Sequence, residues 1–128
     1  MMRRLYSTTL RDVGSETPEL LAQGVLILFA AGAPAELAEV SVLHEASAPP
    51  GAAPVAGDAL HIGDAAFRIT AVGATAWAKV VELGHVVFSF TGAAAAGRPG
   101  EICVAPRPDV NLADLLVPGT TLAIVAAA

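Results

Sequence analysis

The sequence predicts a small, mainly β protein: a closed or partly open β-barrel or sandwich with two or three short helices. Many short apolar segments are separated by Gly and Pro turns, and the segments with helix signals are brief. No internal repeat or linker divides the 128 residues. A chain of this length buries about two-thirds of its unfolded surface around one core. We therefore expect a single domain over residues 1–128.

The first expected elements are a strand over residues 5–10 and a short helix over residues 17–23. Thr17 is placed to cap this helix, Pro18 suits the first helical position, and Gly24 ends it. Residues 25–29 are wholly apolar, which predicts a strand buried on both faces. A helix of one or two turns over residues 34–38 then precedes a strand over residues 40–45.

Residues 46–57 are rich in Ala, Pro and Gly and are expected to form an irregular loop. A hairpin follows, in which strands 59–62 and 65–70 flank Gly63-Asp64, a pair suited to a two-residue turn. This turn places Leu60 opposite Phe67.

The last third of the chain is expected to hold one helix and three strands. The helix covers residues 74–83, buries Trp77 and Val80 or Val81, and stops at Gly84. The strands are expected over residues 85–90, 101–105 and 120–125, with an alanine-rich loop at 93–97.

Composition excludes several classes of function. Hydrophobic residues make up 55% of the chain, and the mean hydropathy is +0.64. However, the strongest apolar run, residues 25–31, is far shorter than the roughly 20 residues of a membrane-spanning helix. No apolar stretch follows the first four residues, so no secretory signal is visible. The net charge of −5 disfavours nucleic acid. We expect a soluble cytoplasmic protein without direct membrane insertion.

The three histidines are the side chains that titrate near neutral pH by default. Strand alternation places His44 on the same face as Val40 and Val42, at the end of an apolar face. There the imidazole is expected to occupy a half-dry site with one edge open. The pattern alone leaves two interpretations, a hydrogen-bonded structural histidine and a reactive one.

The other two histidines have different settings. His85 directly follows the helix stop at Gly84, where a supporting role in a site and a capping role are both open. His61 precedes the hairpin turn on its polar face and is expected to be a solvated surface residue.

No other motif indicates chemistry. The histidines are too far apart in sequence for a close-spaced zinc signature, and we expect neither a bound metal nor a cofactor. There is no phosphate-binding glycine loop of the Walker type and no nucleophile elbow. Cys103, the single cysteine, excludes an internal disulfide and has no adjacent basic residue, so we expect an inert buried thiol.

Two blocks resemble the glucitol/sorbitol IIA family of the bacterial phosphoenolpyruvate-dependent sugar phosphotransferase system. The first is the Gly-Ala-Pro-Ala segment at residues 32–35, with its surroundings from Phe29 to Glu39, running on to Leu43-His44. The second is residues 70–73 followed by Glu82-Leu83-Gly84-His85 and the strand to Phe90. The run Tyr6-Ser7-Thr8-Thr9 and the turn at residues 118–120 fit in the same order, so the resemblance covers nearly the whole chain.

The resemblance implies that His44 is the phosphorylated histidine and that His85 is a supporting neighbour of the site. It implies a phosphotransferase component that takes a phosphoryl group from the phosphocarrier protein HPr and passes it to IIB, for glucitol (sorbitol) uptake through IIC. Chemically, such a carrier needs a neutral imidazole whose second nitrogen donates to a carbonyl or carboxylate.

The sequence departs from the family after His44, where Glu45-Ala46-Ser47 stand in place of cysteine and histidine. This keeps open an alternative, a non-catalytic binding or regulatory module of the same fold. The polyol transported, the oligomeric state, the phosphorylated nitrogen and any partner contacts of the acidic residues near His44 are not determined by the sequence.

Overall fold

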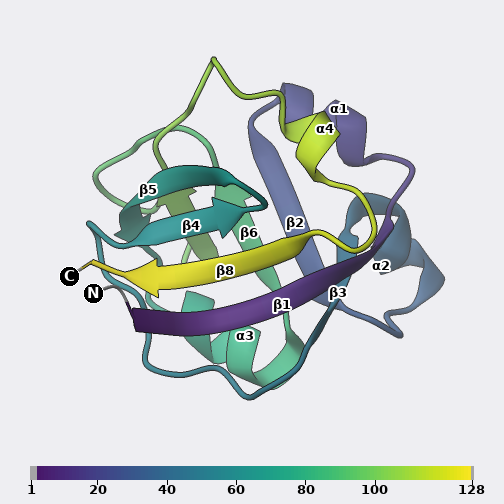
Figure 1. Cartoon of the computed structure of the whole chain (residues 1–128), viewed down its shortest axis with the longest axis horizontal. Coiled ribbons are helices and arrows are strands. Elements are labelled where there is room, and N and C mark those ends of the chain that lie inside the picture. The colour runs from purple at the N-terminus through teal and green to yellow at the C-terminus, as the bar shows by residue number, and fades with distance from the viewer. Residues whose placement is uncertain (1–2, 128) are drawn as a thin grey trace.

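The computed structural model describes residues 3–127, which form a closed barrel of eight strands in the order β1-β3-β2-β6-β7-β5-β4-β8 (Figure 1). The strands are β1 (Arg3–Val13), β2 (Val25–Ala30), β3 (Val42–Ala46), β4 (Ala59–Ile62), β5 (Ala65–Val72), β6 (Val86–Ser89), β7 (Glu101–Val104) and β8 (Thr121–Ala126). The helices are α1 (Thr17–Ala22), α2 (Ala35–Val40), α3 (Ala76–Leu83) and α4 (Leu112–Leu115). The predicted mainly β barrel is confirmed, with four short helices in place of two or three.

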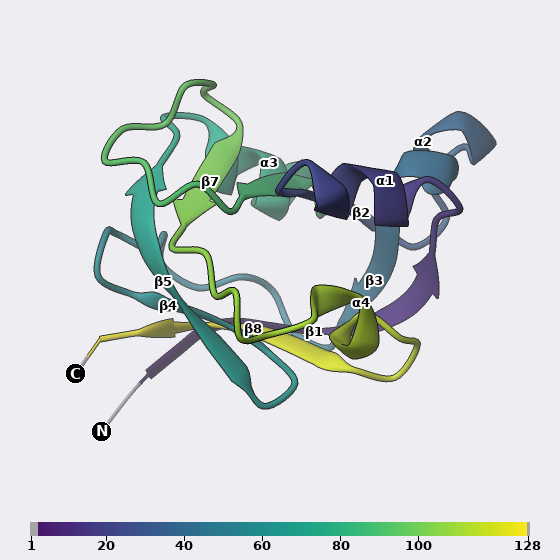
Figure 2. The same ribbon diagram turned by 90° about the horizontal axis from the view of Figure 1, so that it is seen from above.

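Most neighbouring strands are antiparallel, but β2–β3 and β6–β7 are parallel pairs. The long strand β1 pairs with both β3 and β8, and its register shifts once against each. Such bulges bend a strand, which lets one 11-residue strand curve along two partners. The beginning of β1 and the end of β8 run side by side, as Figure 2 shows.

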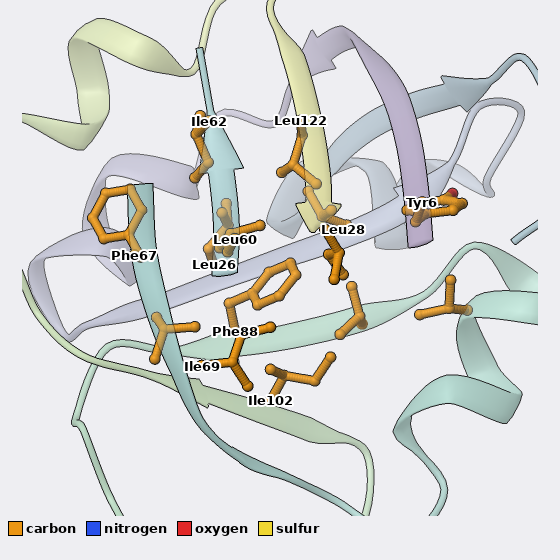
Figure 3. Close-up of a cluster of buried hydrophobic side chains, with 14 of the residues drawn as sticks. Tyr6, Leu26, Leu28, Leu60, Ile62, Phe67, Ile69, Phe88, Ile102 and Leu122 are labelled. Carbon is orange, nitrogen blue, oxygen red and sulfur yellow. The ribbon is translucent and has the colours of Figure 1, made fainter. Parts of the chain in front are cut away.

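The barrel interior is filled by apolar side chains that alternate along the strands. Figure 3 shows Leu26, Leu28, Leu60 and Phe88 gathered at the centre of this interior, and Phe67 belongs to the same buried cluster. All of these are at most 1% exposed. Burying side chains of this size stabilises the fold by about 1.5–3 kcal/mol each, so this buried cluster is a main source of the barrel's stability.

The 59–70 hairpin forms as predicted. Leu60 pairs with Phe67, and the two-residue turn has Gly63 at φ +56°. This left-handed conformation is easy for glycine, which lacks a Cβ. The hairpin could be predicted because the turn pair Gly63-Asp64 and the alternation of apolar residues indicate the same register.

The strand predicted over residues 40–45 is wrong at its start. Val40 is the last residue of α2, and the strand begins at Val42. The turn after β1 supplies the reason, because the Gly14 and Glu16 N–H groups bond to the carbonyls of Ser41 and Glu39. Two carbonyls around the end of α2 are thereby satisfied, which helps the helix extend to Val40.

Two further expectations are corrected in the first half of the chain. Thr17 is the first residue of α1 instead of its cap, and its buried hydroxyl has no hydrogen-bond partner. The strand β2 is buried on one face only: Leu26 and Leu28 are buried, whereas Val25 and Ile27 are half-buried beneath α1.

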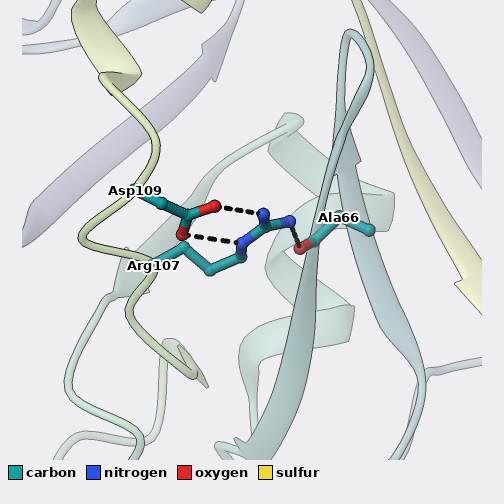
Figure 4. Close-up of polar contacts among 3 residues, drawn as sticks. All are labelled: Ala66, Arg107 and Asp109. Atoms are coloured by element: carbon teal, nitrogen blue, oxygen red, sulfur yellow. Dashed lines mark hydrogen bonds and ion pairs between the residues drawn. The ribbon is translucent and has the colours of Figure 1, made fainter.

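The helix α4 was not anticipated by the sequence reasoning. The sequence does contain a local signal for this helix, the capping residue Asn111, whose side chain accepts a hydrogen bond from the Ala113 N–H in the first turn. The segment before it is held against β5 by Arg107, which donates to Asp109 and to the Ala66 carbonyl (Figure 4).

The helix α3 packs against β6 and adds side chains to the buried core. Its Ala76 and Val80 join the same buried cluster as the strand residues, whereas Val81 is 59% exposed. Trp77 is half-buried, less than predicted, because its indole N–H reaches out to the Gly51 carbonyl at 2.9 Å. In residues 3–127, no helix has the length and apolarity needed to cross a membrane.

Candidate functional site

His44 lies in β3 beside the core residue Val42, and its side chain is 3% exposed. The apolar setting agrees with the strand pattern, but the open edge expected from the sequence is absent. Two segments distant in sequence enclose the ring: β1, and the turn between α3 and β6. A polar ring buried this deeply needs a hydrogen-bond partner for each nitrogen.

Both nitrogens of His44 have such partners. Nε2 lies 2.6 Å from the Gly84 carbonyl oxygen, and Nδ1 lies 2.6 Å from Thr8 Oγ1. Because a carbonyl can only accept, the neutral ring carries its proton on Nε2. The Thr8 hydroxyl, which can donate, therefore donates to the bare Nδ1. The structure thus fixes one tautomer of His44.

Burial also sets the charge of the ring. Loss of solvent lowers the pKa of His44 below its ordinary value of 6.5, and the bond to the Gly84 carbonyl opposes this shift only in part. His44 is therefore neutral at pH 7. A neutral imidazole with one defined lone pair can act as a nucleophile.

Tyr6 forms a second contact on the Nδ1 side. Its hydroxyl lies 3.5 Å from Nδ1, and its ring meets the His44 ring edge-on at a centroid distance of 6.2 Å. The rings of Trp77 and Tyr6 also meet edge-on, at a centroid distance of 5.9 Å. Burial raises the pKa of Tyr6, so its hydroxyl remains protonated at neutral pH. The Nδ1 side of His44 is therefore lined by two hydroxyl groups.

The sequence reasoning assigned no role to Tyr6 or Thr8, although it noted the run that contains them. The available signal was strand alternation, because Tyr6, Thr8 and Leu10 are all buried along β1. That pattern gives the shared face, but it cannot show that this face meets His44, 36 residues away from Thr8 in the chain.

Gly84 positions the carbonyl that holds Nε2. It ends α3 in a left-handed conformation with φ +63°, and its N–H bonds to the Val80 carbonyl. A Cβ at this position would lie 2.9 Å from the Ala30 Cβ. Both the backbone conformation and the close approach of β2 therefore require glycine here.

His85 uses its side chain differently. Its Nδ1 lies 3.1 Å from the Leu28 carbonyl, and its ring packs on Phe29 at a centroid distance of 5.0 Å. Within the described part of the chain, no hydrogen bond joins His85 to His44. The group that reaches His44 is instead the Gly84 carbonyl, which belongs to the peptide bond directly before His85. His61 is half-buried in β4, outside this cluster.

The remaining candidates lie elsewhere. Cys103 is buried with its Sγ 3.5 Å from a Glu101 carboxylate oxygen, and burial together with that charge raises the pKa of the thiol. The reactive thiolate is therefore disfavoured. Glu45 is exposed and paired with Arg11 at 3.2 Å. Over residues 3–127, no group of three or more His, Cys, Asp or Glu side chains is arranged to hold a metal ion.

Comparison with known proteins identifies the family. Residues 5–117 match the family described as "PTS system glucitol/sorbitol-specific IIA component". The chain belongs to this family. The glucitol/sorbitol-specific EIIA components of Shigella flexneri and Escherichia coli (strain K12) are each 37% identical to it over 109 residues, which cover 84% of this chain and 88% of the relative.

A solved structure supports the fold of this IIA chain. The PTS system IIA component from Enterococcus faecalis V583 superposes with a TM-score of 0.73 and covers 91% of this chain and 96% of its own. At 23% identity this likeness concerns the barrel alone. The family match includes Tyr6, Thr8, His44 and Gly84, so the residues of the site all lie inside the matched region.

We expect Gly84→Ala to destabilise the protein by about 1–3 kcal/mol, because alanine is strained at positive φ and its Cβ meets Ala30. The measurement is the free energy of unfolding from urea titration. The matched control is Gly100→Ala, since a Cβ at Gly100 meets nothing within 4 Å. Equal stability of the two variants would contradict the role given to Gly84.

Proposed function

We propose that this IIA chain is a cytoplasmic phosphocarrier that receives a phosphoryl group from HPr on His44 and passes it to the IIB component. The transfer would supply glucitol (sorbitol) phosphorylation during uptake through IIC. Membership of the family makes the chain a component of a sugar phosphotransferase system. The observation that carries the assignment to His44 is its neutral ring with one nitrogen committed to a backbone carbonyl.

The chemistry suits such a ring. Phosphoryl transfer between histidines depends mainly on positioning and on stabilisation of charge. With the proton fixed on Nε2, the lone pair of Nδ1 becomes free to react once the Thr8 hydroxyl turns away, and no ring proton has to leave. The arrangement supports reversible transfer between proteins and requires no metal or cofactor, so we propose that none takes part.

We propose that His85 supports His44 by restraining the peptide bond between Gly84 and His85, whose carbonyl bonds to His44. The imidazole of His85 is anchored on Leu28 and Phe29 of β2. This anchor restrains the peptide whose carbonyl meets His44 Nε2. His85 would then act as a positioning residue, and its own ring would not need to touch the phosphoryl group.

A second candidate function follows from the burial of His44. A ring that is 3% exposed and bonded at both nitrogens also suits a structural histidine in a non-catalytic binding or regulatory module. The two functions differ in one measurable respect, since only the carrier becomes phosphorylated.

Incubation with phosphoenolpyruvate, enzyme I and HPr should add one acid-labile, base-stable phosphoryl group, detected by intact-mass spectrometry. His44→Ala should abolish the addition because it removes the accepting nitrogen. Its folding is verified by a thermal melt. No phosphorylation of the wild-type chain would favour the non-catalytic module, and unchanged phosphorylation of His44→Ala would assign the acceptor to another residue.

His85→Ala should slow phosphorylation by about a hundredfold while leaving His44 the labelled residue, since a misplaced reacting group typically costs this much. His61→Ala is the matched control and should keep a near-native rate, because His61 lies outside the site. Rates are compared for variants with similar thermal melts. Near-native rates for both variants would show that His85 has no part in transfer.

A further inference from the structure

We propose that Nδ1 of His44 is the atom that takes the phosphoryl group, and that the Thr8 hydroxyl next to it orients the phosphoryl oxygens. This inference rests on the proposed function of His44 and assigns the reacting atom within it. It also gives a role to β1, which carries none of the histidines.

The first argument is the unequal status of the two nitrogens. Nε2 faces the Gly84 carbonyl, a group fixed in the backbone at the end of α3 and unable to rotate or to donate. Phosphorylation of Nε2 would replace its proton and set the new group against that carbonyl oxygen. Nδ1 faces the hydroxyl of Thr8, which can turn about its side-chain bond. On the Nδ1 side, rotation of a side chain is enough to free the nitrogen from its hydrogen-bond partner.

The second argument is the chemistry of the groups near Nδ1. Thr8 Oγ1 and the Tyr6 hydroxyl lie 2.6 Å and 3.5 Å from this nitrogen. Each hydroxyl is one donor and can accept as well. A phosphoryl group offers acceptor oxygens, so the two hydroxyls can turn from the nitrogen to those oxygens. Thr8 is 1% exposed, which makes its hydrogen bond stronger than one in water.

The third argument is access. Tyr6 also lines a surface hollow of about 230 Å³, together with Arg4, Ser7, Ser47 and Gly51. This hollow offers a cation and hydroxyls to an incoming phosphoryl group. The segment of residues 47–51, which lines this hollow, is held by two hydrogen bonds at Gly51. The Gly51 N–H donates to the Leu5 carbonyl, and the Trp77 indole N–H donates to the Gly51 carbonyl. Displacing this segment and Tyr6 would open the Nδ1 side.

The transfer step is balanced without an added reactant. The Nδ1 lone pair of neutral His44 attacks the phosphorus of the donor phosphohistidine, forming the new N–P bond. The donor N–P bond breaks, and its electron pair returns to the donor imidazole. The Nε2 proton stays in place, and the Gly84 carbonyl at the C-terminal end of α3 stabilises the positive charge that the ring acquires.

The test is to phosphorylate the ¹⁵N-histidine-labelled protein with phosphoenolpyruvate, enzyme I and HPr, and to record long-range ¹H–¹⁵N and ³¹P spectra. Nδ1 couples strongly only to Hε1, whereas Nε2 couples strongly to both ring protons, so the nitrogen that gains the coupling to phosphorus is identified. We expect Nδ1 of His44. Phosphorus on Nε2 would overturn this inference while leaving the proposed function intact. The absence of any label would overturn both.

Thr8→Val tests the hydroxyl. We expect it to slow phosphorylation about tenfold or more, since a donor aimed at transferring oxygens is lost. Thr8→Ser should restore most of the rate. Thr9→Val is the matched control, because Thr9 is the half-buried neighbour of Thr8 in β1. Equal rates for Thr8→Val and Thr9→Val, at matched thermal melts, would show that the Thr8 hydroxyl has no role.

Discussion

A polar ring buried inside an apolar barrel must have both of its nitrogens satisfied, and this constraint ties together the parts of the site. His44 meets it with the Gly84 carbonyl on one side and the Thr8 hydroxyl on the other. The first partner depends on α3 ending at a left-handed glycine, and the second depends on β1 pairing with β3. The closed barrel, the helix end and the long first strand are therefore all needed to hold one imidazole.

Among the residues that the structure describes, no carboxylate hydrogen-bonds to His44, and this matters for the charge of its ring. A carboxylate beside the ring would favour the charged form. A carbonyl on Nε2 and a hydroxyl on Nδ1 instead fix the tautomer, while burial keeps the ring neutral. The same burial closes the site, so the proposed transfer at Nδ1 would require local movement around Tyr6.

Local patterns in the sequence were sufficient to predict many of the strands and helices. The turn pair at Gly63 and the alternation around it predicted the hairpin, and the stop at Gly84 predicted the end of α3. The end of α2 was missed because it is set by hydrogen bonds from the segment after β1, which no local pattern reveals. His44 and His85 were selected by resemblance to a family, since spacing alone left both roles open. Tyr6 and Thr8 were missed because their meeting with His44 depends on strand order.

The most direct test of this account is the tautomer of His44 in the free protein, read from the ¹⁵N shifts and long-range ¹H–¹⁵N couplings of its ring at pH 7. Assignment uses His44→Gln, whose spectrum lacks the His44 signals. The account predicts a neutral ring with a protonated Nε2 and a bare Nδ1, insensitive to pH between 7 and 8. A proton on Nδ1, a charged ring, or rapid exchange between tautomers would contradict it.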